Sequence, residues 1–87
     1  MDEQIAKTIE LIRITCRAFF GTEIEASGSY QKDFNEIKIK ILPMSEVKIR
    51  YVIGKNGATS QSLQNLINVW GIMQGYPKIR IFVANKP

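Results

Sequence analysis

Apolar residues recur at helical spacing through the first part of the chain. One face consists of residues three and four positions apart: Ile5, Ile9, Ile12, Cys16 and Phe19. Charged residues recur with the same spacing on the opposite face. This pattern predicts a helix from residue 2 or 3 to Phe20, with Asp2 as its N-cap and Gly21 as its stop.

Further along, apolar and polar residues alternate, which is typical of strands. The alternation is weak over residues 22–30, which suits a short, bulged or edge strand. It is clean over residues 36–42, where Ile37, Ile39 and Ile41 face one way. Lys38 and Lys40 face the other way. We therefore predict two strands joined by the polar stretch 31–35.

The helical pattern returns after Pro43-Met44-Ser45, where Ser45 is suited to cap a short helix from about Glu46 to Ile53. The four residues Gly54-Lys55-Asn56-Gly57 follow, and a longer helix is predicted from about Ala58 to Gln74. Its predicted apolar stripe consists of Leu63, Leu66, Ile67, Trp70 and Met73. Its predicted polar side consists of Gln61, Gln64, Asn65 and Asn68.

The chain ends in a predicted third strand. Gly75 ends the long helix, and Pro77 begins a run in which Ile79, Ile81 and Val83 share one face. The order is helix, strand, strand, helix, loop, helix, strand. Three strands with one buried face covered by three helices form a two-layer α+β fold, here a single domain over residues 1–87.

Charge is distributed unevenly along this sequence. The net charge is +4, from 12 basic and 8 acidic residues. Residues 1–35 carry more acids than bases, so the positive charge belongs to the part that begins at Glu36. A balance of this kind permits a polyanionic partner without requiring one.

The residue types argue against several function classes. The chain has one cysteine and no histidine, and its acids are scattered, so neither a nucleophile nor a metal cluster is expected. The loop lacks the G-x-x-x-x-G-K-[ST] spacing of a P-loop. We expect no enzyme and no cofactor. No apolar run approaches the ~20 residues that span a bilayer, and a single cysteine favours a reducing compartment, so we expect a cytoplasmic protein without membrane insertion.

The loop at 54–57 is the most informative motif. Glycine lets the backbone turn tightly and approach another chain closely. The helix that starts at Ala58 presents free N–H groups and its positive dipole end at the same place. Such a position is suited to bind a phosphate.

The sequence VIGKNGAT at residues 52–59 resembles the loop of a type II KH domain, the form usual in bacteria. The segment 62–68 is similar to the helix after the loop in the KH domain of Jag proteins, and the element order also fits small stand-alone bacterial KH proteins. Two features depart from the family pattern. Arg50 stands where the family usually has a small residue. Residues 59–62, which carry hydroxyl and amide side chains, stand where basic residues are common in the family.

This resemblance implies that the chain binds about four nucleotides of single-stranded RNA. The nucleic-acid backbone would lie against Gly54 to Gly57. Lys55 would meet a phosphate as a point charge and Asn56 as a hydrogen-bond donor. Thr59 and Ser60 would add hydroxyl contacts.

The bases would lie in the groove beside the loop. Apolar contacts there would come from Ile53, Ala58 and Ile41, while Lys48 and Arg50 would add charge to one rim. The partners implied are single-stranded RNA, with single-stranded DNA left open, and a second KH copy or another RNA-binding protein.

Two alternatives remain open at this point. The first is a KH fold without nucleic-acid binding that serves as a protein-interaction or dimerisation module. The second concerns the outer face of the sheet, where Lys38, Lys40, Lys78 and Arg80 lie beside Phe82. That face would either bind nucleic acid by stacking and charge, or be a solvated face that guards against edge pairing.

Overall fold

The computed structural model describes residues 1–44 and 46–84, except for the side chains of residues 46–48. The elements are α1 (Asp2–Phe20), β1 (Ile24–Gln31), β2 (Glu36–Pro43), α2 (Glu46–Ile53), α3 (Ala58–Met73) and β3 (Lys78–Val83). Short 3₁₀ turns occupy Lys32–Phe34 and Lys55–Gly57. The predicted order of helices and strands and the α+β class are confirmed. Ser45, the predicted cap of α2, lies outside the described residues.

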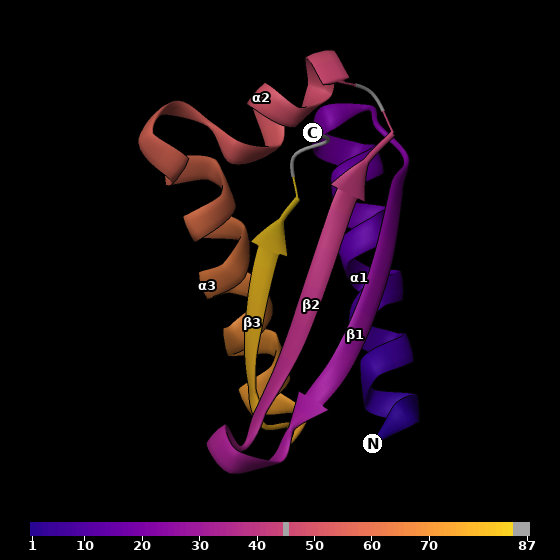
Figure 1. The fold of residues 1–87 in the computed structure, drawn as a ribbon, viewed down its shortest axis with the longest axis vertical. Coiled ribbons are helices and arrows are strands. Elements are labelled where there is room, and N and C mark those ends of the chain that lie inside the picture. Colours follow the sequence, from indigo (N-terminus) through magenta and orange to yellow (C-terminus); the bar gives the residue numbers. More distant parts are fainter. Residues whose placement is uncertain (45, 85–87) are drawn as a thin grey trace.

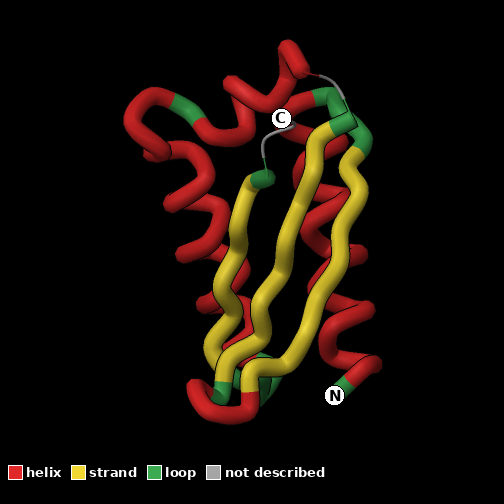
Figure 2. The backbone as a smooth tube through the Cα atoms, viewed as in Figure 1, coloured by secondary structure: helices red, strands yellow, loops and turns green. Residues whose placement is uncertain are grey.

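The three strands form one mixed sheet in the order β1-β2-β3. β1 pairs antiparallel with β2, while β3 pairs parallel with it. A parallel pair needs a long crossover connection, and α2, the 54–57 loop and α3 supply it. Figures 1 and 2 show the sheet in front, with α1 and α3 behind it and α2 across one end.

The core lies between the sheet and the helices. Ile37, Ile39 and Ile41 on the central strand have no exposed surface, as the clean alternation of β2 predicts. The neighbouring strands add Ile24 and Ile79 from the same face. The helices contribute Ile12, Cys16, Val52, Leu63 and Ile67.

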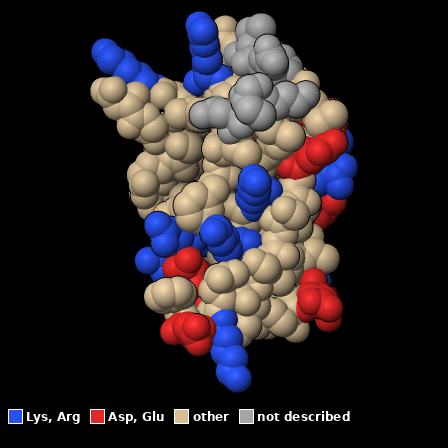
Figure 3. Space-filling view, viewed as in Figure 1, with Lys and Arg blue, Asp and Glu red and all other residues tan. Residues whose placement is uncertain are grey.

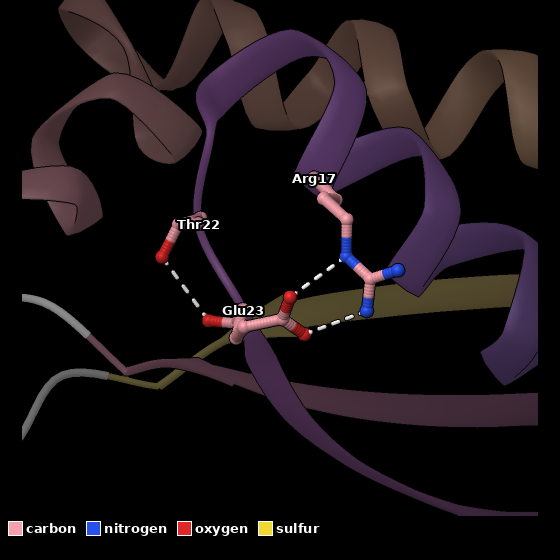
Figure 4. Close-up of polar contacts among 3 residues, drawn as sticks. All are labelled: Arg17, Thr22 and Glu23. Atoms are coloured by element: carbon pink, nitrogen blue, oxygen red, sulfur yellow. Dashed lines mark hydrogen bonds and ion pairs between the residues drawn. The ribbon is translucent and has the colours of Figure 1, made fainter.

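α1 is joined to β1 by a tight turn and an ion pair. Gly21 ends the helix as predicted, with a φ of 62° and its N–H donating to the Arg17 carbonyl. The Arg17 guanidinium then donates to both carboxylate oxygens of Glu23, at 2.7 and 2.9 Å, and Thr22 donates its hydroxyl to the Glu23 carbonyl (Figure 4). This bidentate pair lowers the pKa of the Glu23 carboxyl.

Two expectations for α1 are wrong. Met1 rather than Asp2 is the N-cap, and Asp2 lies in the first turn, where its charge suits the helix dipole. Phe19 is 77% exposed although it shares the spacing of the apolar face. The adjacent Phe20 packs against the core instead.

α3 lies along the edge of β3 and bonds to it. Gln64 accepts a hydrogen bond from the Ile81 N–H at 2.9 Å, and Asn68 accepts one from the Ile79 N–H at 3.0 Å. These two residues were predicted to lie on the polar side, yet they satisfy the free amides of an edge strand. Correspondingly, Leu66 and Met73 of the predicted stripe are 63% and 79% exposed.

No helix in the described part of the chain is long and apolar enough to cross a membrane. Likewise, residues 1–44 and 46–84 hold no group of three or more histidine, cysteine or acidic side chains placed to bind a metal.

Cys16 makes the stability of the fold sensitive to alkaline pH. Burial raises the pKa of its thiol from 9.0 to about 11. The unfolded thiol ionises at its ordinary pKa while the folded one stays protonated. We therefore expect this contribution to the free energy of unfolding to be complete below pH 9 and to be lost as pH rises from 9 to 11.

Urea denaturation at several pH values, on the wild type and Cys16→Ala, measures this effect. The wild type should lose more stability than the variant across that window. Parallel losses in the two proteins would show that the thiol is not the cause.

Candidate nucleic-acid interface

The loop between α2 and α3 has positive backbone φ angles and is held by its own hydrogen bonds. Gly54 donates its N–H to the Arg50 carbonyl at 2.8 Å, and Gly57 donates to the Gly54 carbonyl at 3.2 Å. Gly54, Asn56 and Gly57 all have positive φ, at 75°, 55° and 74°. Asparagine tolerates this region better than most residues. The turn is therefore formed by backbone hydrogen bonds and positive φ angles. The loop projects from the corner where α2 meets α3 (Figure 1).

Gly54 and Gly57 are required for different reasons. Gly54 has a ψ of 175°, a backbone region that is open essentially only to glycine. A Cβ on it would also lie 2.8 Å from the Thr59 backbone nitrogen and close to the Thr59 hydroxyl. By contrast, a Cβ on Gly57 would meet no atom nearer than 3.9 Å, the Ser60 hydroxyl. The close approach to Thr59 thus constrains Gly54, whereas only the positive φ constrains Gly57.

α3 begins without a side-chain cap. Gly57 is its N-cap, and the first turn carries no acidic residue to offset the positive end of the helix dipole. The Ser60 hydroxyl donates to the Gly57 carbonyl at 3.1 Å, which holds the junction between loop and helix. The Gly57 and Ala58 N–H groups already donate to the Gly54 and Lys55 carbonyls, so an external anion would have to meet the N–H groups further into the first turn.

Most of the predicted site residues come together on this corner. Lys55, Asn56 and Ala58 are exposed at the loop, and Arg50 is exposed one turn earlier on α2. Partly buried residues form the base of the site: Ile53, Gly54, Gly57, Thr59 and Ser60. Basic side chains project from this end of the molecule in Figure 3.

Two of the predicted site residues, Ile41 and Lys48, are not placed at the exposed corner by the described structure. Ile41 has no exposed surface, because its side chain lies on the core face of β2, so the expectation that it contacts a base is wrong. The side chain of Lys48 lies outside the described part of the structure. Tyr51, which is not one of the predicted site residues, is 59% exposed, and it lies two residues before the loop.

Neither a scan against models of known protein families nor a search of curated proteins finds a match. The function of this corner must therefore be argued from its own geometry and charge.

The two glycines provide a test of the loop geometry. Gly54→Ala should lower the free energy of unfolding by about 1–3 kcal/mol, because the new Cβ is both strained and crowded against Thr59. Gly57→Asn should cost less than about 1 kcal/mol, because asparagine accepts left-handed φ and the space is open. Urea denaturation gives both values. Equal losses for the two variants would contradict the distinction.

Proposed function

We propose that this chain binds single-stranded RNA through the loop at Gly54–Gly57, in the manner of a type II KH domain. The observation that supports this best is the close approach of Gly54 to the start of α3. It brings the backbone of the loop against the uncapped helix end and leaves Lys55 and Asn56 exposed at the tip. A phosphodiester can therefore contact backbone N–H groups, the Lys55 ammonium and the Asn56 side-chain amide at the same time.

The binding mode follows from the surroundings of the loop. Lys55 attracts a phosphate as a point charge, and the Asn56 amide donates to a phosphate oxygen. Ile53 and Ala58 offer apolar contact to a base, while Arg50 adds charge to the rim. Only a few phosphates are neutralised, so the salt dependence should be shallow, with a slope of about −0.7 for each contact.

This proposal describes a binding module rather than an enzyme. By resemblance to Jag proteins and small stand-alone bacterial KH proteins, its proposed setting is the bacterial cytoplasm. The affinity of a single site for about four nucleotides is modest. A second copy or a neighbouring RNA-binding protein would raise it through effective concentration.

The loop is tested by Lys55→Asp/Asn56→Asp. Aspartate accepts the left-handed φ of Asn56, so the variant should fold. It replaces attraction by repulsion, and RNA affinity should fall at least about tenfold. In an NMR titration of the labelled wild type with a degenerate single-stranded RNA pool, the amides of residues 53–60 should shift, and these loop shifts should be absent in the variant.

Lys32→Asp/Asn35→Asp is a matched control at the other end of the molecule. It makes the same charge change, and Asn35 also has a positive φ, of 46°. This control should bind RNA nearly as the wild type does. If the wild type shows no shifts at residues 53–60 with millimolar RNA, the proposed function is wrong. A degenerate single-stranded DNA pool, titrated in parallel, decides between the two nucleic acids.

A second candidate function, self-association, is favoured by an apolar surface between α1 and α3. Thr15 and Phe19 of α1 line it together with Leu66, Val69 and Met73 of α3. Those four apolar side chains are each more than half exposed. A patch of adjoining large apolar residues is uncommon on a monomer and marks an interaction site.

Self-association is tested by Leu66→Glu, with Ile72→Glu as its control. Ile72 is 64% exposed on the same helix but lines neither apolar hollow. If a second copy covers the α1–α3 surface, light scattering after size exclusion should show a dimer in the wild type and in Ile72→Glu. Leu66→Glu should be monomeric. A wild type that stays monomeric at about 0.5 mM, well above the dissociation constants of typical dimers, would reject this candidate.

A further inference from the structure

The outer face of the sheet is open and built in regular rows. The strand register places Ser27, Lys40 and Phe82 in one row across β1, β2 and β3. The next row holds Ser29, Lys38 and Arg80. None of the described helices covers this face, which is the front of the molecule in Figures 1 and 3.

The charge of this face is predominantly positive. Its outward positions carry four cations, Lys38, Lys40, Lys78 and Arg80, and two carboxylates, Glu25 and Glu36. Glu36 lies 3.8 Å from Arg80, and its side chain is only 13% exposed. Lys38 and Lys40 take part in no ion pair among the described residues. Figure 3 shows basic side chains gathered over the middle of this face.

These lysines do not guard a sheet edge. Lys38 and Lys40 belong to β2, which is paired on both sides. The edge amides of Ile79 and Ile81 on β3 are already occupied by Asn68 and Gln64 of α3. Protection against edge pairing, the usual reason for lysines on a strand, therefore does not explain their position.

An aromatic ring lies among the cations. Phe82 is 37% exposed, with the Lys38 ammonium 4.8 Å and the Arg80 guanidinium carbon 5.1 Å from its ring centroid. Cations at this distance are attracted to the ring face. When Lys38 turns from the ring to a phosphate, the ring face that it leaves becomes a stacking surface for a base.

A hollow of about 260 Å³ adjoins the lysines. It is lined by Ser27, Gly28, Ser29 and Gln31 of β1 with Lys38 and Lys40 of β2. Gln31 donates its side-chain amide to the Ser29 hydroxyl at 2.9 Å. Hydroxyls and an amide beside two cations suit a ribose and its phosphates, with their many hydrogen-bonding groups, better than an apolar partner.

We propose that this outer face is a second binding surface for single-stranded RNA, separate from the loop. Lys38 and Lys40, about 6.6 Å apart along the strand, hold successive phosphates, and Phe82 stacks on a base. The inference rests on the proposed function only for the class of ligand, since the two surfaces share no residue.

The test uses the whole chain and a fluorescent octamer of uridylate, with an abasic octamer of the same backbone. Lys38→Gln/Lys40→Gln should weaken uridylate binding about tenfold and reduce the salt slope by about 1.4. Phe82→Leu should weaken uridylate binding about tenfold and leave abasic binding unchanged. Lys7→Gln/Arg13→Gln, which removes the same charge from the exposed face of α1, should bind like the wild type.

The loop and the sheet face are distinguished by NMR. In the Lys55→Asp/Asn56→Asp variant, RNA should still shift the amides of Lys38, Lys40 and Arg80. Such shifts support RNA binding at the sheet face. If the loop amides of the wild type do not shift, only the proposed function of the loop is rejected. The inference is overturned if these amides do not shift with millimolar RNA, or if the lysine variant and its α1 control bind equally. Equal binding of uridylate and abasic RNA by the wild type would also overturn it. Backbone spectra establish that each variant is folded.

Discussion

The burial of one face of β2 is the constraint on which the other elements depend. Ile37, Ile39 and Ile41 are fully enclosed, and burial of each contributes about 1.5–3 kcal/mol relative to exposure. Side chains alternate strictly along a strand, so enclosing these three forces Lys38 and Lys40 to the opposite face. The contact that forms the core thereby also creates the basic outer surface.

The positions of α1 and α3 depend on two close approaches to the sheet. A Cβ on Gly28 of β1 would lie 2.6 Å from Ile5 of α1, and a Cβ on Gly71 of α3 would lie 2.5 Å from Ile79 of β3. Close packing of α3 on β3 lets Gln64 and Asn68 reach the strand's free amides.

Three surfaces of different chemistry result from this arrangement. The loop corner offers backbone, one lysine and an uncapped helix end, whereas the outer sheet face offers several cations around a ring. The α1–α3 surface is apolar. The loop and the sheet face are suited to anions, and the apolar surface is suited to another protein surface. The loop corner and the apolar surface adjoin at Thr59, which also lines one of the apolar hollows.

Periodicity along the sequence determined the elements, because each helix and strand has to bury its own apolar residues. It correctly predicted the bounds of α2, the stop at Gly21 and the two faces of β2. The loop was also evident, since a glycine pair between helices has a local backbone cause. Only the tertiary structure decided which apolar residues are covered. Phe19, Leu66 and Met73 fit the helical stripes but lie beyond the area that the sheet covers. Ile41 was expected to line the groove and is enclosed, while Gln64 and Asn68 serve the edge of β3 rather than solvent. These outcomes depend on how closely two elements distant in sequence approach each other, which the spacing of residues within one element does not specify.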